Sequence, residues 1–205
     1  MRSRKVSVWL ALVFTALFAG GAPSPGAAES ENSRELRPAK ASRQATREST
    51  TAARSNDAVV LVLTGVIQPG AYRQFRAAIS RRNPAVIVLD SPGGVLGEAL
   101  LIGDEVRRRG MNTLVGPNGS CPSACAVVFL SGRTKFMGKG AEVGLHSAFS
   151  TNGRVNPRAT QVMASYLSGV GVPSGILRRM AQTAPSDIRW LTKAEQKALR
   201  IRPMS

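Results

Sequence analysis

Three short segments of the chain carry residue types that could do chemistry on a substrate. The segment Ser91–Gly94 (SPGG) follows an apolar run, and its glycines can turn backbone N–H groups toward a bound anion or oxyanion. Ser123 stands among small residues just before the apolar stretch Ala126–Leu130, and His146 is the only histidine. Imidazole is the usual base for a serine nucleophile in acyl transfer.

Each of these segments also has a structural interpretation. In a strand-to-helix turn, Asp90 or Ser91 could cap the following helix. Ser123 could likewise be a helix N-cap, and a lone histidine such as His146 is often a structural hydrogen-bonding residue. Spacing alone therefore does not pair Ser123 with His146.

Strand and helix patterns alternate around these segments. Residues 58–66 (AVVLVLTGV) form a continuous β-branched and leucine run, long enough for a strand covered on both faces. Repeated strand–helix alternation implies an α/β fold with crossover connections. Thr192 and Glu195 have the spacing of a capping box. We expect strands at 58–66, 85–89, 113–115, 134–137 and 142–145, and helices at 71–80, 95–109, 123–130, 158–168, 173–184 and 192–199.

The amino-terminal part of the chain has the pattern of an export signal. Basic residues precede an apolar run of fourteen residues, 6–19, which is shorter than the about twenty that a spanning helix needs. We predict a signal peptide at 1–28, cut after Ala28, with a cut after Ala22 or an uncleaved anchor as alternatives. Residues 29–56 are almost free of large apolar side chains, which predicts a flexible linker. Residues 57–205 then form one domain, exported to the periplasm.

The net charge and the cysteine content limit which partners and which metals the protein is expected to bind. The formal net charge is +16, but the basic residues are scattered or in short runs with few aromatics, which argues against nucleic acid. A solvated surface or proximity to an anionic membrane fits this charge better. Cys121 and Cys125 lie four residues apart and could form a disulfide in an oxidising compartment. Two cysteines do not complete a zinc site, so we expect no metal.

The order of these motifs resembles a known family. SPGG, a helix, a strand, the small-residue turn GSCPSACA around Ser123 and a strand ending in His146 resemble the proteolytic subunit of Clp protease. The order is also similar to signal peptide peptidase A and to the membrane-bound SPGG serine proteases, and the resemblance spans about residues 58–201. It implies an α/β fold of the Clp protease and crotonase superfamily, with stacked strand–helix units and C-terminal helices that support a homo-oligomer.

The resemblance also implies roles for single residues. Ser123 matches the family nucleophile and His146 the general base, while the backbone amides of Gly94 and Ala124 match the oxyanion hole. These roles agree with the physical needs of acyl transfer, which requires a hydroxyl deprotonated by imidazole and two donors aimed at the oxyanion.

Two departures from the family pattern concern the rest of the site. Asp187 is the natural candidate for the aspartate that orients the histidine. However, when residues 190–192 (WLT) are aligned with the family's aromatic-Leu-Ser motif, Ile188 rather than Asp187 falls at the position of that aspartate. Cys125 replaces a family glycine two residues after the nucleophile, and a bridge to Cys121 would brace the serine turn. If reduced, either cysteine could itself be a nucleophile, although free thiolates seldom survive in an oxidising compartment.

From this resemblance we expect an exported serine hydrolase, a peptidase that cleaves peptide or protein substrates through an acyl-enzyme and needs no cofactor. The main alternative is a catalytically inactive Clp-like scaffold or peptide-binding protein. An acyl-CoA enzyme of the crotonase branch is disfavoured, because coenzyme A is cytoplasmic and that branch does not need a Ser-His pair.

Overall fold

The computed structural model describes residues 60–82 and 84–204. The predicted signal peptide (1–28) and linker (29–56) lie outside these residues. The elements follow one another as β1 (Val60–Thr64), α1 (Ala71–Arg82), β2 (Val86–Asp90), α2 (Leu96–Arg108), β3 (Asn112–Val115), β4 (Ser120–Pro122), α3 (Ala124–Leu130), β5 (Lys135–Met137), β6 (Glu142–Leu145), α4 (Pro157–Gly169), α5 (Ser174–Gln182), β7 (Arg189–Trp190), α6 (Lys193–Ala198) and β8 (Arg202–Pro203).

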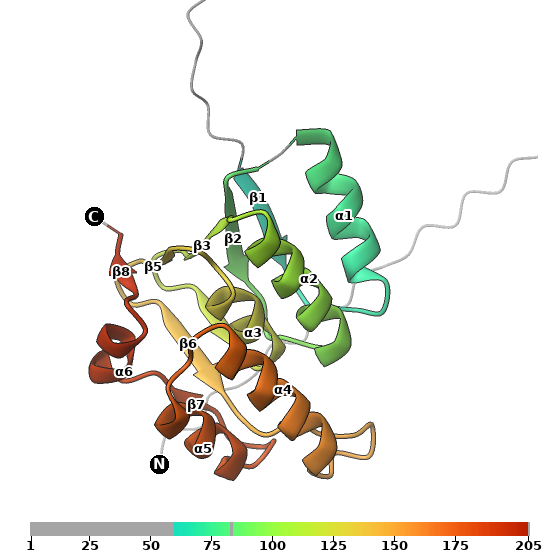
Figure 1. The fold of residues 1–205 in the computed structure, drawn as a ribbon, viewed down its shortest axis with the longest axis vertical. Coiled ribbons are helices and arrows are strands. Elements are labelled where there is room, and N and C mark those ends of the chain that lie inside the picture. The colour runs from blue at the N-terminus through green and yellow to red at the C-terminus, as the bar shows by residue number, and fades with distance from the viewer. Residues whose placement is uncertain (1–59, 83, 205) are drawn as a thin grey trace, which may run out of the picture. The chain divides into compact units, whose positions relative to one another are not determined.

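Two sheets organise the described residues (Figure 1). The larger has the strand order β1-β2-β3-β5-β8, and all of its neighbouring strands are parallel. The smaller has the order β4-β6-β7, in which β4 and β6 are parallel and β7 is antiparallel to β6. Helices α1 and α2 make the crossovers between the first three parallel strands. This arrangement confirms the predicted α/β fold.

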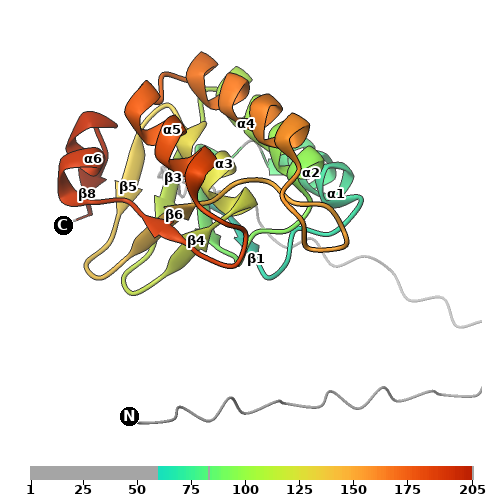
Figure 2. The ribbon, with the colours of Figure 1, turned by 90° about the horizontal axis from the view of Figure 1, so that it is seen from below.

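The helices lie along one side of the strands (Figure 2). Beneath them, Ile87 and Leu89 of β2 are fully buried. On the other face of β1, Val60 and Val62 keep 49% and 59% of their surface exposed. The prediction that the first strand is covered on both faces is therefore wrong. The run is apolar, but β1 is the edge strand and its outer face has no covering element among the described residues.

Three strands, β4, β7 and β8, were not predicted. They are two or three residues long, which is too short for a period-two pattern to stand out. Helix α3, in contrast, was predicted from its apolar run, and all seven of its residues are buried. It forms the centre of the core and carries Ser123 at its amino-terminal end. Within 60–82 and 84–204, no helix is both long enough and apolar enough to cross a bilayer.

Candidate active site

Ser123 has a backbone conformation that few residues other than glycine adopt. Its φ is 59° and its ψ is −132°, at the junction between β4 and α3. Such a conformation costs about 1–3 kcal/mol and persists only where the surroundings enforce it, often at functional sites. Although Ser123 is the N-cap of α3, its side chain makes no capping hydrogen bond among the described residues. The hydroxyl is thus not used by the helix, contrary to the interpretation of Ser123 as a cap.

Two sets of bonds hold this turn in place. The Ser123 backbone N–H donates to the Gly144 carbonyl at 2.9 Å, which continues the pairing of β4 with β6. A disulfide joins Cys121 to Cys125 across the turn, with their Cα atoms 5.1 Å apart and both side chains fully buried. Because both cysteines of the chain are in this bridge, neither is a free thiolate nucleophile in this structure.

The SPGG turn packs directly on the Ser123 turn. Gly94 forms a parallel bridge with Ile67, whose N–H donates to Gly93 O at 2.8 Å and whose carbonyl accepts from Val95 N–H at 2.9 Å. In such a bridge the N–H of Gly94 itself points away from Ile67. A Cβ on Gly93 would lie 2.9 Å from the Ala124 nitrogen, so the two turns touch through their backbones.

Two backbone donors therefore remain for a ligand beside Ser123. The N–H groups of Gly94 and Ala124 have no acceptor among the described residues. The Ala124 N–H belongs to the first turn of α3, where amides lack intrahelical partners and favour negative charge. These are the two amides that the resemblance assigns to an oxyanion hole.

His146 follows β6 and is only 6% exposed. Its Nδ1 lies 2.7 Å from the backbone carbonyl oxygen of Ser147. Because a carbonyl oxygen can only accept, Nδ1 is the donor in this contact, and in the tautomer with one ring proton Nε2 is left as an acceptor. This tautomer is the one that a general base for a serine hydroxyl requires.

Ser147, whose carbonyl orients the imidazole, is itself held in place. Its backbone N–H and its hydroxyl both donate to the Thr183 carbonyl, at 3.0 Å and 2.8 Å. Thr183 ends α5, and its hydroxyl donates to the Arg179 carbonyl one helical turn earlier, at 2.8 Å. Helix α5 therefore acts as the support for the base.

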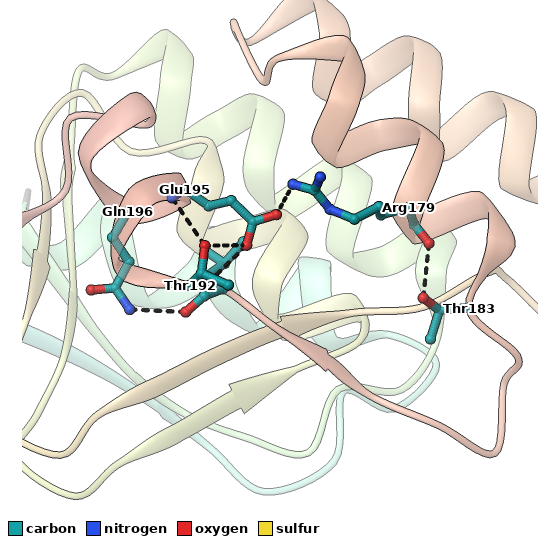
Figure 3. A network of polar contacts seen from close by, with 6 residues as sticks. Arg179, Thr183, Thr192, Glu195 and Gln196 are labelled. Atoms are coloured by element: carbon teal, nitrogen blue, oxygen red, sulfur yellow. Dashed lines mark hydrogen bonds and ion pairs between the residues drawn. The ribbon is translucent and has the colours of Figure 1, made fainter.

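A polar network holds α5 against α6 (Figure 3). The guanidinium of Arg179 pairs with the buried carboxylate of Glu195, which also accepts from Thr192 N–H at 2.7 Å and Thr192 Oγ1 at 3.0 Å. Burial raises the pKa of Glu195, but the bonds from Thr192 and Arg179 outweigh it and hold the pKa below its usual range. The predicted capping box of Thr192 and Glu195 is confirmed.

One cavity of about 420 Å³ brings the site together. Ser123, His146, Gly94 and Ala124 all line it, and most of its remaining walls are apolar. One of these walls is Phe149, whose ring centroid lies 5.8 Å from that of His146. Four of the five residues predicted for catalysis thus meet at one place.

The structure does not bring Asp187 to this place. It is exposed, is absent from the cavity lining, and its backbone N–H donates to Ala184 O at 3.0 Å. The β6–β7 register pairs Leu145 with Arg189, and continuing it by one residue puts Ile188 opposite His146. Asp187 as the orienting carboxylate stays a prediction that this geometry does not support.

Sequence reasoning missed the groups that hold the base. The acceptor for Nδ1 is the main chain of Ser147, and the support behind it is the main chain of Thr183. Every residue has a carbonyl, so no side-chain type could mark these positions in the sequence.

We compared the chain with protein families, curated proteins and solved structures, and the solved structures show a similar fold. No protein-family model matches the sequence, and no curated protein matches it either. Among solved structures, the 1510-N membrane protease specific for a stomatin homolog from Pyrococcus horikoshii is 21% identical, with a TM-score of 0.50 over 71% of this chain and 72% of that chain.

Two further structures are similar. A mutant of the 1510-N membrane-bound stomatin-specific protease in complex with a substrate peptide is 22% identical, with a TM-score of 0.53 over 71% of this chain and 74% of that chain. The ClpP protease catalytic domain from Plasmodium falciparum is 15% identical, with a TM-score of 0.55 over 71% of this chain and 85% of that chain. These similarities confirm the predicted α/β fold, which is similar to the folds of these proteases.

Proposed function

We propose that the chain is an exported serine peptidase that hydrolyses peptide bonds through an acyl-enzyme, with Ser123 as nucleophile and His146 as base. The observation that carries the proposal is the strained turn at Ser123, whose side chain makes no capping bond. Ser123 shares one cavity with His146 and with two amides that have no acceptor within 60–82 and 84–204. A structural serine needs neither the strain nor the neighbouring donors.

In this mechanism, His146 Nε2 takes the Ser123 proton as Oγ attacks the carbonyl carbon of the substrate. The electron pair of the C=O bond moves to the oxygen, which the Gly94 and Ala124 amides stabilise. The C–N bond then breaks as the imidazolium returns its proton to the leaving nitrogen. Water repeats the sequence on the acyl-enzyme and releases the acid, so no cofactor takes part.

Several observations support the substrate class and the compartment. A structurally similar protease was solved with a substrate peptide, and the walls of the cavity offer apolar surface to a peptide side chain. The Cys121–Cys125 bridge supports an oxidising compartment, in keeping with the predicted signal peptide. Self-association and proximity to an anionic membrane stay predictions.

A fluorophosphonate probe tests the proposal, because an activated serine oxygen displaces its fluoride and forms a stable P–O bond. We expect wild-type protein to be labelled and Ser123→Ala to stay unlabelled. Ser150→Ala is the matched control, since Ser150 lines the same cavity, and it should be labelled as wild type is. Unlabelled wild type, or undiminished labelling of Ser123→Ala, would refute the proposal.

The orienting group of the base can be tested separately. Because the Ser147 carbonyl fixes the imidazole, we expect Asp187→Asn to change the labelling rate by less than about threefold, whereas His146→Gln should abolish labelling. An orienting aspartate would instead give a loss of about 10⁴-fold on conversion to asparagine. Such a loss in Asp187→Asn, with an unchanged melting temperature, would restore Asp187 to the site.

A peptide-binding scaffold without catalysis is the second candidate. The observation in its favour is that no carboxylate contacts His146 among the described residues. The same labelling experiment separates the two functions, because a scaffold would bind peptides without reacting with the probe.

A further inference from the structure

Another cavity, of about 560 Å³, is lined by residues of β5, α6 and β8. These three elements lie near the carboxyl terminus in Figure 1. This cavity shares no lining residue with the cavity that holds Ser123. Four of its lining residues are cationic and none is acidic: Arg133, Lys135, Arg200 and Arg202. These residues come from two separate parts of the chain, which the pairing of β5 with β8 brings together.

The four cations have no carboxylate partner within 60–82 and 84–204, where all three ion pairs involve Glu105 or Glu195. Lys135 is half-buried, and its ammonium has one hydrogen bond, to the Gly132 carbonyl at 3.5 Å. Burial lowers the pKa of Lys135, and the charge of Arg200 lowers it further. The cavity therefore carries positive side-chain charge that no carboxylate of the described residues neutralises.

Helix dipoles compensate only part of this charge. The carboxyl-terminal ends of α3, α4 and α6 border the cavity through Leu130, Val170 and Leu199. A helix terminus carries at most about −0.5 of an elementary charge, so three termini supply roughly −1.5 against four full positive charges. The four side-chain charges therefore exceed these partial negative charges, which favours an anionic ligand at this cavity.

Arg200 follows the end of α6. Its φ is 52°, in the left-handed region just beyond the end of α6, where glycine is the usual residue. An arginine there is conformationally unfavourable and contributes its charge to the cavity. The helix end accounts for this conformation, because Arg200 N–H donates to Lys197 O at 3.0 Å and Ile201 N–H donates to Gln196 O at 2.9 Å.

We propose that this basic cavity, defined by Arg133, Lys135, Arg200 and Arg202, is a binding site for a dianionic phosphate monoester group. Arginine guanidinium groups match phosphate oxygens in pairs, and the lysine adds a point charge. The group could belong to a soluble phosphate monoester or to the headgroup of an anionic lipid. The site is independent of the proposed peptidase activity, because no catalytic residue lines it.

Calorimetric titration of the full chain with glycerol 3-phosphate tests the site, with glycerol as the uncharged control. We expect the phosphate ester to bind and glycerol not to bind. Lys135→Gln and Arg200→Gly should each weaken binding by about tenfold or more, the value of one charge-assisted contact. Arg200→Gly should keep or raise the melting temperature, because glycine suits φ 52°, so its loss of binding cannot be ascribed to unfolding.

A matched control removes a positive charge elsewhere. Arg81 is exposed on α1, and Arg81→Gln should change the affinity by less than about twofold. Equal weakening by Arg81→Gln and Arg200→Gly would overturn the site in favour of diffuse surface charge.

Sedimentation with phosphatidylcholine vesicles, with and without phosphatidic acid, identifies the source of the phosphate. Binding that needs phosphatidic acid and is lost in Arg200→Gly indicates a lipid headgroup. Binding of free glycerol 3-phosphate without such vesicle binding indicates a soluble ligand. Wild type that binds neither would overturn the proposal.

Discussion

Ser123→Gly is expected to destroy catalysis and at the same time to stabilise the protein. Its φ of 59° and ψ of −132° are strained for serine and freely accessible to glycine. Glycine would relieve about 1–3 kcal/mol of backbone strain. This gain exceeds the cost of ordering the more flexible glycine on folding, which is about 0.5–1 kcal/mol. We expect a net gain of about 1 kcal/mol, or about 2–4 °C in melting temperature. Peptidase activity should fall by about 10⁴-fold or more, because the nucleophile is removed.

Ser123→Ala is the matched control for this result. Alanine also lacks the hydroxyl but keeps the strain, so activity should fall equally while the melting temperature stays near that of wild type. If Ser123 were a true helix cap, alanine would instead cost about 1 kcal/mol and glycine a few tenths. A melting temperature below that of wild type in both variants would therefore contradict the strained-nucleophile interpretation.

Gly94→Ala is expected to damage both the fold and the oxyanion hole. A Cβ at this position would lie 2.3 Å from the backbone carbonyl oxygen of Ile67, and φ is 145°, where side chains are rarely tolerated. We expect a loss of about 2 kcal/mol or more in the free energy of unfolding, measured by urea denaturation. In the fraction that stays folded, kcat should fall by about 10²–10³-fold, because the Gly94 N–H is displaced from the oxyanion.

Gly97→Ala provides the control three residues further along. Gly97 lies in α2, and a Cβ there would meet no atom within 4 Å. Alanine should therefore stabilise the helix by up to about 1 kcal/mol and leave activity unchanged. Equal behaviour of the two alanine variants would show that the Ile67–Gly94 bridge does not constrain the SPGG turn.

Much of the fold and part of the site could be predicted from the sequence. Apolar runs and helical spacing located the longer parallel strands β1, β2, β3, β5 and β6, and helix α3, because neighbouring residues determine those patterns. The order of SPGG, Ser123 and His146 predicted the residues that meet at the catalytic cavity. The roles assigned to them came from that order, since each residue alone also has a structural interpretation.

Long-range contacts account for what could not be predicted. The strain at Ser123 depends on β4, a three-residue strand that forms only because β6 pairs with it. The support for His146 is a pair of main-chain carbonyls, at Ser147 and Thr183, which leave no mark on residue type. Asp187 lay at a plausible sequence position, but the β6–β7 register, continued by one residue, puts Ile188 rather than Asp187 opposite His146.

The sequence by itself determined the chemistry that is available: one histidine, a serine among small residues, a double glycine and two cysteines in bridging distance along the chain. Only the tertiary structure decided how these groups are used. Strand register and helix packing join residues that lie far apart in sequence, and they set which hydroxyl is free, which nitrogen is protonated and which cations share a cavity. Local patterns do not encode such contacts, because those depend on the packing of the whole domain.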